Sequence, residues 1–143
     1  MSFKLDYNEP IAKVVERLTE EHKELHSKLE RILWEEKSGN LPVAISLLNL
    51  IKPQILRHAV EEEALIARVI VAEHENESRE SIEIFQQHRR IEEFLQDKLP
   101  RLSELPRKQK SNEIEEFASE LEKHHREEEA VAFPLALKSN SNR

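Results

Sequence analysis

The chain has 143 residues, a formal net charge of −7, one glycine and no cysteine. Its 36% charged and 38% hydrophobic residues are typical of a helical protein with solvated outer faces. The lack of cysteine excludes a disulfide framework and thiolate metal sites, and the acidic balance argues against nucleic acid as a partner. No apolar run reaches the roughly 18 residues of a membrane span, and no signal peptide is evident, so we expect a cytoplasmic protein without membrane contact.

The first predicted helix begins near Asn8, a good capping residue, with Pro10 in its first turn. Its apolar residues recur three and four positions apart and form one stripe, which also contains His22. We expect this helix to end at Ser38 and Gly39, because glycine readily takes the backbone conformation that closes a helix.

The second predicted helix carries His58 and Glu62 on its apolar stripe. Pro53 lies inside this helix and is expected to kink it, unless a short break falls there. A polar connection from Glu73 to Arg79 follows and divides the chain near its middle.

The third predicted helix carries His88 and ends near Pro100, and residues 101–110 form a connection of undefined length. The fourth carries His124 and Glu128, and Pro134 is expected to bend its last turns. Four helices with short links predict an all-α fold, an antiparallel up-down-up-down four-helix bundle. We expect a single domain over residues 1–143 with its core at about 8–138.

An internal repeat relates the two halves of the chain. Polar residues on the apolar stripes pair at an offset of 66 positions: His22 with His88, His58 with His124, and Glu62 with Glu128. The gap between the two histidines is 36 positions in both halves (58 − 22 and 124 − 88). The sequence therefore predicts two helical-hairpin repeats, each contributing a histidine and a His-x-x-x-Glu pair.

These six polar side chains need a shared explanation, because burying a carboxylate or imidazole without a partner costs several kcal/mol. A lone histidine on an apolar stripe is usually a satisfied core residue, and a lone His-x-x-x-Glu pair is usually a surface pair. Their joint occurrence at one offset favours a metal site instead. Four imidazoles and two carboxylates suit iron, manganese, zinc or copper, and two carboxylates able to bridge favour two ions.

Two further histidines lie close to this pattern. His26, one turn after His22, is a candidate fifth histidine ligand, and the equivalent position in the second repeat is Glu92. His125 is rotated by about 100° from His124, so we expect it at the flank of the stripe or as a partner supporting a ligand.

The motif set resembles the hemerythrin-like family, also called HHE cation-binding domains, over about residues 8–138. The resemblance rests on His22, His58-x-x-x-Glu62, His88, and His124-x-x-x-Glu128 followed by Phe133 and Pro134. It implies a four-helix bundle around two iron ions (Fe2+/Fe3+) with an oxo or hydroxo bridge, bridging glutamates and terminal histidines. Zinc or manganese could substitute for iron.

The chain looks closer to the stand-alone microbial members than to the oxygen carriers of marine invertebrates. The oxygen carriers place a His-x-x-x-His pair on the third helix and close with an aspartate, whereas this chain closes with Glu128. The resemblance implies a protein that binds or senses O2, NO or peroxide, or handles iron, rather than an enzyme.

Two other functions remain open from the sequence. One is a ferritin-like di-metal oxidase or peroxidase, but that class needs two Glu-x-x-His pairs and only Glu122-x-x-His125 fits. The other is a helical interaction bundle with a structural metal. The sequence leaves a protein partner or a homodimer undecided.

Overall fold

The computed structural model describes residues 4–139, and this part of the chain is helical without strands, which confirms the predicted all-α class. The elements in chain order are α1 (Ile11–Lys37), α2 (Leu41–Glu61), a π-helical stretch η1 (Glu62–Ala67), α3 (Arg68–Glu73), a 3-10 turn η2 (Glu75–Glu77), α4 (Arg79–Gln86), α5 (His88–Glu93), a second π-helical stretch η3 (Phe94–Lys98), a 3-10 stretch η4 (Leu99–Glu104), α6 (Arg107–Glu127), a third π-helical stretch η5 (Glu128–Ala132) and α7 (Phe133–Leu137).

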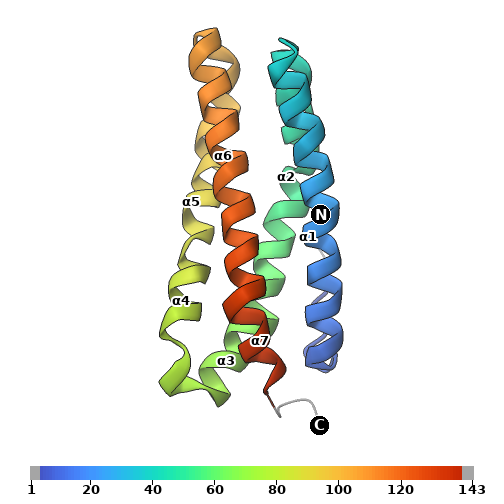
Figure 1. The fold of residues 1–143 in the computed structure, drawn as a ribbon, viewed down its shortest axis with the longest axis vertical. Coiled ribbons are helices and arrows are strands. Elements are labelled where there is room, and N and C mark those ends of the chain that lie inside the picture. The colour runs from blue at the N-terminus through green and yellow to red at the C-terminus, as the bar shows by residue number, and fades with distance from the viewer. Residues whose placement is uncertain (1–3, 140–143) are drawn as a thin grey trace.

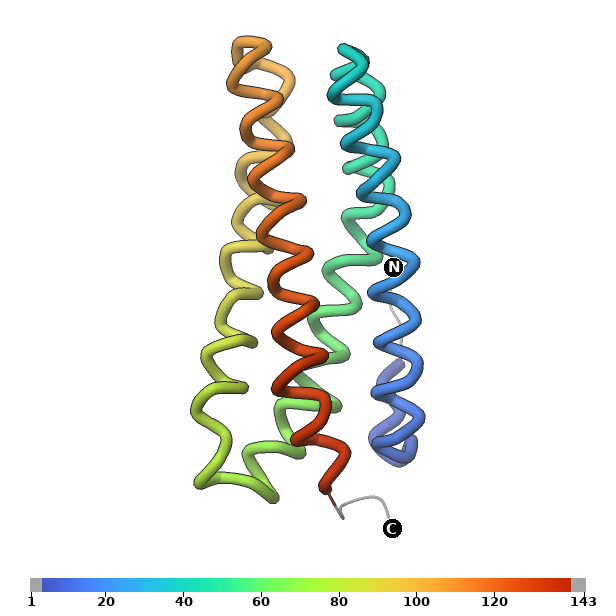
Figure 2. The backbone as a smooth tube through the Cα atoms, viewed as in Figure 1, coloured from blue at the N-terminus to red at the C-terminus, as the bar shows by residue number. Residues whose placement is uncertain are grey.

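The helices lie side by side along one long axis (Figure 1). In that view the chain ascends through α1, descends through α2, ascends through α4 and α5, and descends through α6 and α7. The tube in Figure 2 follows the same course, and α1 contacts both α2 and α6. Residues far apart in the sequence therefore face each other across α1 and α6.

The end of α1 lies where the sequence predicts it. Gly39 takes a φ of 87°, a left-handed conformation that side chains with a Cβ rarely adopt. The turn then brings the Asn40 N–H to the Glu35 carbonyl at 2.8 Å, which satisfies a carbonyl left free at the helix end.

The later boundaries differ in part from the prediction. The 3-10 stretch η4 occupies much of the expected connection after helix three, so α6 already begins at Arg107 and the link is shorter than 101–110. α2 continues through Pro53 without a break. Pro134 lies in the first turn of α7, which continues directly from η5.

The core consists of two apolar clusters, one on each side of the histidines and glutamates that lie on the apolar stripes. Along α1, Val14 and Leu18 belong to one cluster and Leu25 to the other, so His22 lies between them. Along the last helical run, Leu121 and Phe133 divide in the same way around His124 and Glu128. The histidines and glutamates therefore share one layer of the protein between two apolar layers.

Candidate metal centre

The six side chains predicted as ligands meet in this layer, together with one more histidine. Their ligand atoms form two groups, within each of which all atoms lie within 4.8 Å of one another. The group that we name the first position contains His22, His58, His125 and Glu128, and the second position contains Glu62, His88, His124 and Glu128. The members are all buried, and Glu62 and Glu128 are 0% exposed.

Glu62 contacts histidines from both groups. Its Oε2 lies 2.8 Å from His58 Nε2, on its own helical run, and its Oε1 lies 2.8 Å from His88 Nε2. His22 Nε2 is 3.3 Å from Oε2. The two oxygens of one carboxylate thus face different histidines, as a carboxylate between two cations would.

Glu128 mirrors this arrangement with poorer hydrogen-bond geometry. Its Oε2 lies 3.0 Å from His124 Nε2, and its Oε1 lies 3.2 Å from His22 Nε2. Despite these short distances, neither Glu128 oxygen nor His124 Nε2 has an aligned hydrogen-bond partner. Buried polar atoms that approach each other without pairing are expected where they converge on a shared cation.

The other ring nitrogen of each of four histidines has its own partner. The Nδ1 contacts are His22 with Glu129 at 2.7 Å, His58 with Glu21 at 2.6 Å, His88 with Glu63 at 3.2 Å, and His124 with Gln87 at 2.8 Å. Since an ionised carboxylate only accepts, the imidazole Nδ1 facing it must carry the hydrogen. This tautomer turns Nε2 toward the centre, as metal-binding histidines require.

Charge balance raises the histidine pKa values in the metal-free protein. Burial by itself lowers the pKa of His22, but Glu128 and Glu62 outweigh it and raise that pKa to about 9. The same balance raises the pKa of His58 to about 10 and of His88 to about 12. Without a cation, protonated imidazoles therefore supply the positive charge that the buried carboxylates need.

The pKa values of Glu62 and His125 are both lowered. Burial raises the pKa of Glu62, but His58 and His124 outweigh it and hold that pKa well below its usual range. Burial and the neighbouring His22 lower the pKa of His125 well below its usual range. Glu62 is therefore ionised and His125 neutral, the protonation states that metal ligands adopt.

The sequence predicts His125 at the flank of the stripe or as a partner supporting a ligand, whereas its buried ring lies within the first position. It stacks on His22 with the ring centroids 3.9 Å apart and the planes 13° from parallel. His26, the candidate fifth histidine, lies outside both groups with its side chain 51% exposed, and contacts Glu30 and Glu122. The structure thus brings His125, and not His26, to the other histidines.

The sequence does not predict the π-helical stretches, and two of them begin at the glutamates of the site. η1 starts at Glu62 and η5 at Glu128, 66 positions later. A π-helical turn contains an extra residue and re-aims the side chains around it, and such turns concentrate at functional sites. No residue type marks them in the sequence, because glutamate and alanine fit an ordinary α-helix equally well.

The donor set fits two divalent or trivalent cations by its chemistry. Five imidazoles and two carboxylates, with no thiolate, suit iron, zinc or manganese. Glu128 belongs to both groups and Glu62 contacts histidines of both, so each can serve two ions.

Two grooves reach the layer from outside. The first, of about 370 Å³, is lined by His22, Lys23, His26, Ser27, Leu29, Glu122, His125, Arg126 and Glu129. The second, of about 590 Å³, is lined by Glu63, Ala67, Ile82, Phe85, Gln86, His88, Arg89 and Glu92. Four lining residues correspond at the 66-residue offset, for example His22 with His88 and Glu129 with Glu63.

No known protein family, curated protein or solved structure matches this chain. Among residues 4–139, none of the helices combines the length and apolar character needed to cross a membrane.

Proposed function

We propose that this chain is a hemerythrin-like protein that holds two iron ions in the layer between its apolar clusters and binds a small ligand such as O2 or NO. The observation that carries the proposal is the pair of four-residue groups joined by Glu128. We further propose that the helices form an up-down-up-down four-helix bundle of two hairpin repeats. In support, the six predicted ligands, two π-helical stretches and parts of both grooves repeat at the 66-residue offset.

Iron bound in these groups would supply redox chemistry and an open coordination position for a small molecule. The protein's own contribution is to present neutral Nε2 atoms, with each orienting hydrogen held on Nδ1. Apolar residues on both sides of the layer, including Leu18 and Leu25, exclude water from the carboxylates. Metal binding would have to release the protons that His22 and His58 otherwise hold.

The second position has two histidines where the first has three, so it is the better candidate for an open coordination site. The second groove reaches His88, and its lining includes the apolar Ala67, Ile82 and Phe85 together with the charged Glu63, Arg89 and Glu92. A small molecule could therefore reach the second position through this groove.

The test is metal analysis of the purified protein together with its optical spectrum before and after exposure to oxygen and to nitric oxide. We expect about two irons per chain after anaerobic reconstitution and spectral changes with at least one of the two gases. Glu62→Ala should lose the metal, since it removes a carboxylate that contacts three histidines.

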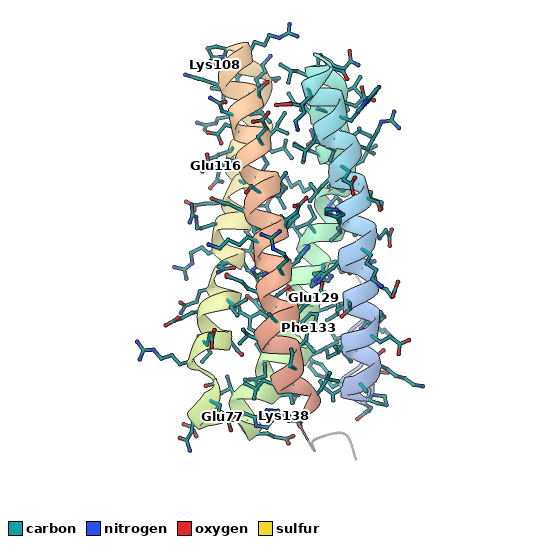
Figure 3. All side chains as sticks on the ribbon, viewed as in Figure 1. Glu77, Lys108, Glu116, Glu129, Phe133 and Lys138 are labelled. Carbon is teal, nitrogen blue, oxygen red and sulfur yellow. The ribbon has the colours of Figure 1, made fainter. Side chains whose placement is uncertain are left out.

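Glu116→Ala is the matched control, because Glu116 is exposed and lies on α6 well away from Glu129 (Figure 3). It should keep the full metal content. Iron content far below one per chain in the wild type would contradict the proposal. Full iron content without any spectral response to either gas would support metal binding but contradict the proposed binding of O2 or NO.

A further inference from the structure

The residues that hold the histidine Nδ1 atoms follow the 66-residue offset as closely as the predicted ligands do. Glu63 and Glu129 are equivalent and are both glutamates, whereas Glu21 corresponds to Gln87. Glu21 accepts from His58 Nδ1 at 2.6 Å, and Gln87 Oε1 faces His124 Nδ1 at 2.8 Å. The two repeats therefore hold equivalent histidines by a charged partner in one and a neutral partner in the other.

The orientation of the Gln87 amide is fixed by a second contact. Its Nε2 donates to Glu127 Oε1 at 3.2 Å, which leaves its oxygen for His124. Gln87 also stands at the break between α4 and α5, where its N–H bonds to the Ile84 carbonyl at 3.1 Å. The Gln87 oxygen is thus held beside the His124 ring as an uncharged hydrogen-bond acceptor.

Glu21 is held as an ionised carboxylate. Its Oε2 accepts hydrogen bonds from Gln54 at 3.2 Å and from Arg57 at 3.3 Å, and its Oε1 accepts from His58 Nδ1. The Arg57 guanidinium, the Gln54 amide and the His58 Nδ1 all donate to it, and donors on both oxygens stabilise the ionised form. A full negative charge therefore lies against the His58 ring.

We propose that Glu21 and Gln87 are positioning residues that make the two metal positions unequal, and this inference rests on the proposed function. A carboxylate on Nδ1 draws the hydrogen toward itself and increases the electron density that Nε2 can donate to a metal. An amide oxygen is uncharged and increases the electron density on Nε2 less than a carboxylate does. His58 is then the stronger donor at the first position, and His124 is the weaker donor at the second.

The first test uses Co2+ as the probe, added to metal-free protein and followed by calorimetry and by visible absorbance. We expect two binding steps, the tighter one at the first position with its three histidines. Glu21→Gln should weaken the tighter step about tenfold and leave the weaker step unchanged. Glu20→Gln, the same chemical change at an exposed neighbour, should alter neither step.

The second test moves the charge in the opposite direction. Gln87→Glu alone would set two carboxylates against each other, because Gln87 donates to Glu127. The double variant Gln87→Glu with Glu127→Gln reverses that hydrogen bond and places the charge beside His124. It should tighten the weaker step about tenfold, whereas Gln96→Glu, at an exposed position outside both grooves, should not.

The outcomes separate this inference from the proposed function. Two cobalt ions per chain with Glu21→Gln indistinguishable from Glu20→Gln, or with both steps weakened equally, would overturn the inference alone. A wild-type protein that binds no cobalt and no iron would overturn the proposed function, and this inference with it.

Discussion

The two sides of the histidine and glutamate layer differ at two pairs of equivalent residues close to the grooves. On the side of the first position, His125 belongs to the metal group and the Phe133 ring stacks on His22 at a centroid distance of 5.4 Å. The equivalent residues in the other repeat are Ala59 and Ala67 (125 − 66 and 133 − 66). Imidazole and phenyl rings on one side are thus replaced by methyl groups on the other.

The groove volumes also differ, at about 370 Å³ for the first groove and about 590 Å³ for the second. On the first side, His125 adds a third histidine to the first position. On the second side, His88 lines the larger groove. Under the proposed function, this contrast predicts that the first position holds its metal more tightly and that small ligands reach the second.

The largest expected effect comes from the residue that both positions share. Glu128→Ala removes a ligand from both groups at once, so both metal-binding steps should weaken by more than the roughly 10–100-fold typical of losing a supporting partner. Calorimetric titration with Co2+ measures this, with Glu116→Ala as the control. Loss of one step only would show that Glu128 serves a single ion.

A smaller effect is expected from His125→Ala, which removes one of three histidines from the first position. The tighter step should weaken by about tenfold to a hundredfold, and the weaker step should stay unchanged. His26→Ala is the matched control, since that side chain is half exposed and lies outside both groups. The reverse pattern would make His26 the fifth histidine.

The space in the second groove can be filled with Ala67→Phe, which introduces the ring that Phe133 provides at the equivalent position. Metal content should stay the same, while association of azide or nitric oxide with the iron-loaded protein should slow about tenfold, or about 1.4 kcal/mol in barrier height. Stopped-flow absorbance measures the rate. Val71→Phe, at an exposed position outside the groove, should leave it unchanged.

An effect on stability, and not on metal binding, is expected at a buried carboxylate that lies away from the histidines. Burial and the neighbouring Glu115 raise the pKa of Glu36 to about 7, and its Oε2 has no hydrogen-bond partner. Folded protein therefore holds a proton that unfolded protein loses above its ordinary pKa of 4.5, so stability falls as pH rises from about 4.5 to 7.

Glu36→Gln should remove this dependence and raise the free energy of unfolding at pH 8 by about 1–3 kcal/mol. Urea denaturation of metal-free protein at pH 5 and pH 8 measures the difference, with Glu116→Gln as the exposed control. An unchanged pH profile would mean that Glu36 ionises freely. The pKa of Glu62 shifts in the opposite direction, because His58 and His124 outweigh its burial.

Much of the site could be predicted from the sequence because helical periodicity and the 66-residue offset act together. His22 and His88 lie on apolar stripes and must face inward, and the offset alone is enough to pair them. His125 could not be predicted in this way, because it has no histidine counterpart at position 59. Its place depends on how α6 packs against α1, where its ring meets His22.

The helical class, the turn at Gly39 and the six inward polar residues follow from the amino-acid sequence, since local conformation and the apolar face of each helix are enough to define them. Three further properties come from the packed helices: the six residues lie in one layer, His125 and not His26 joins them, and the grooves differ in size. Those properties depend on the rotation and height of one helix against another, and such relations are set by packing across the core rather than along the chain.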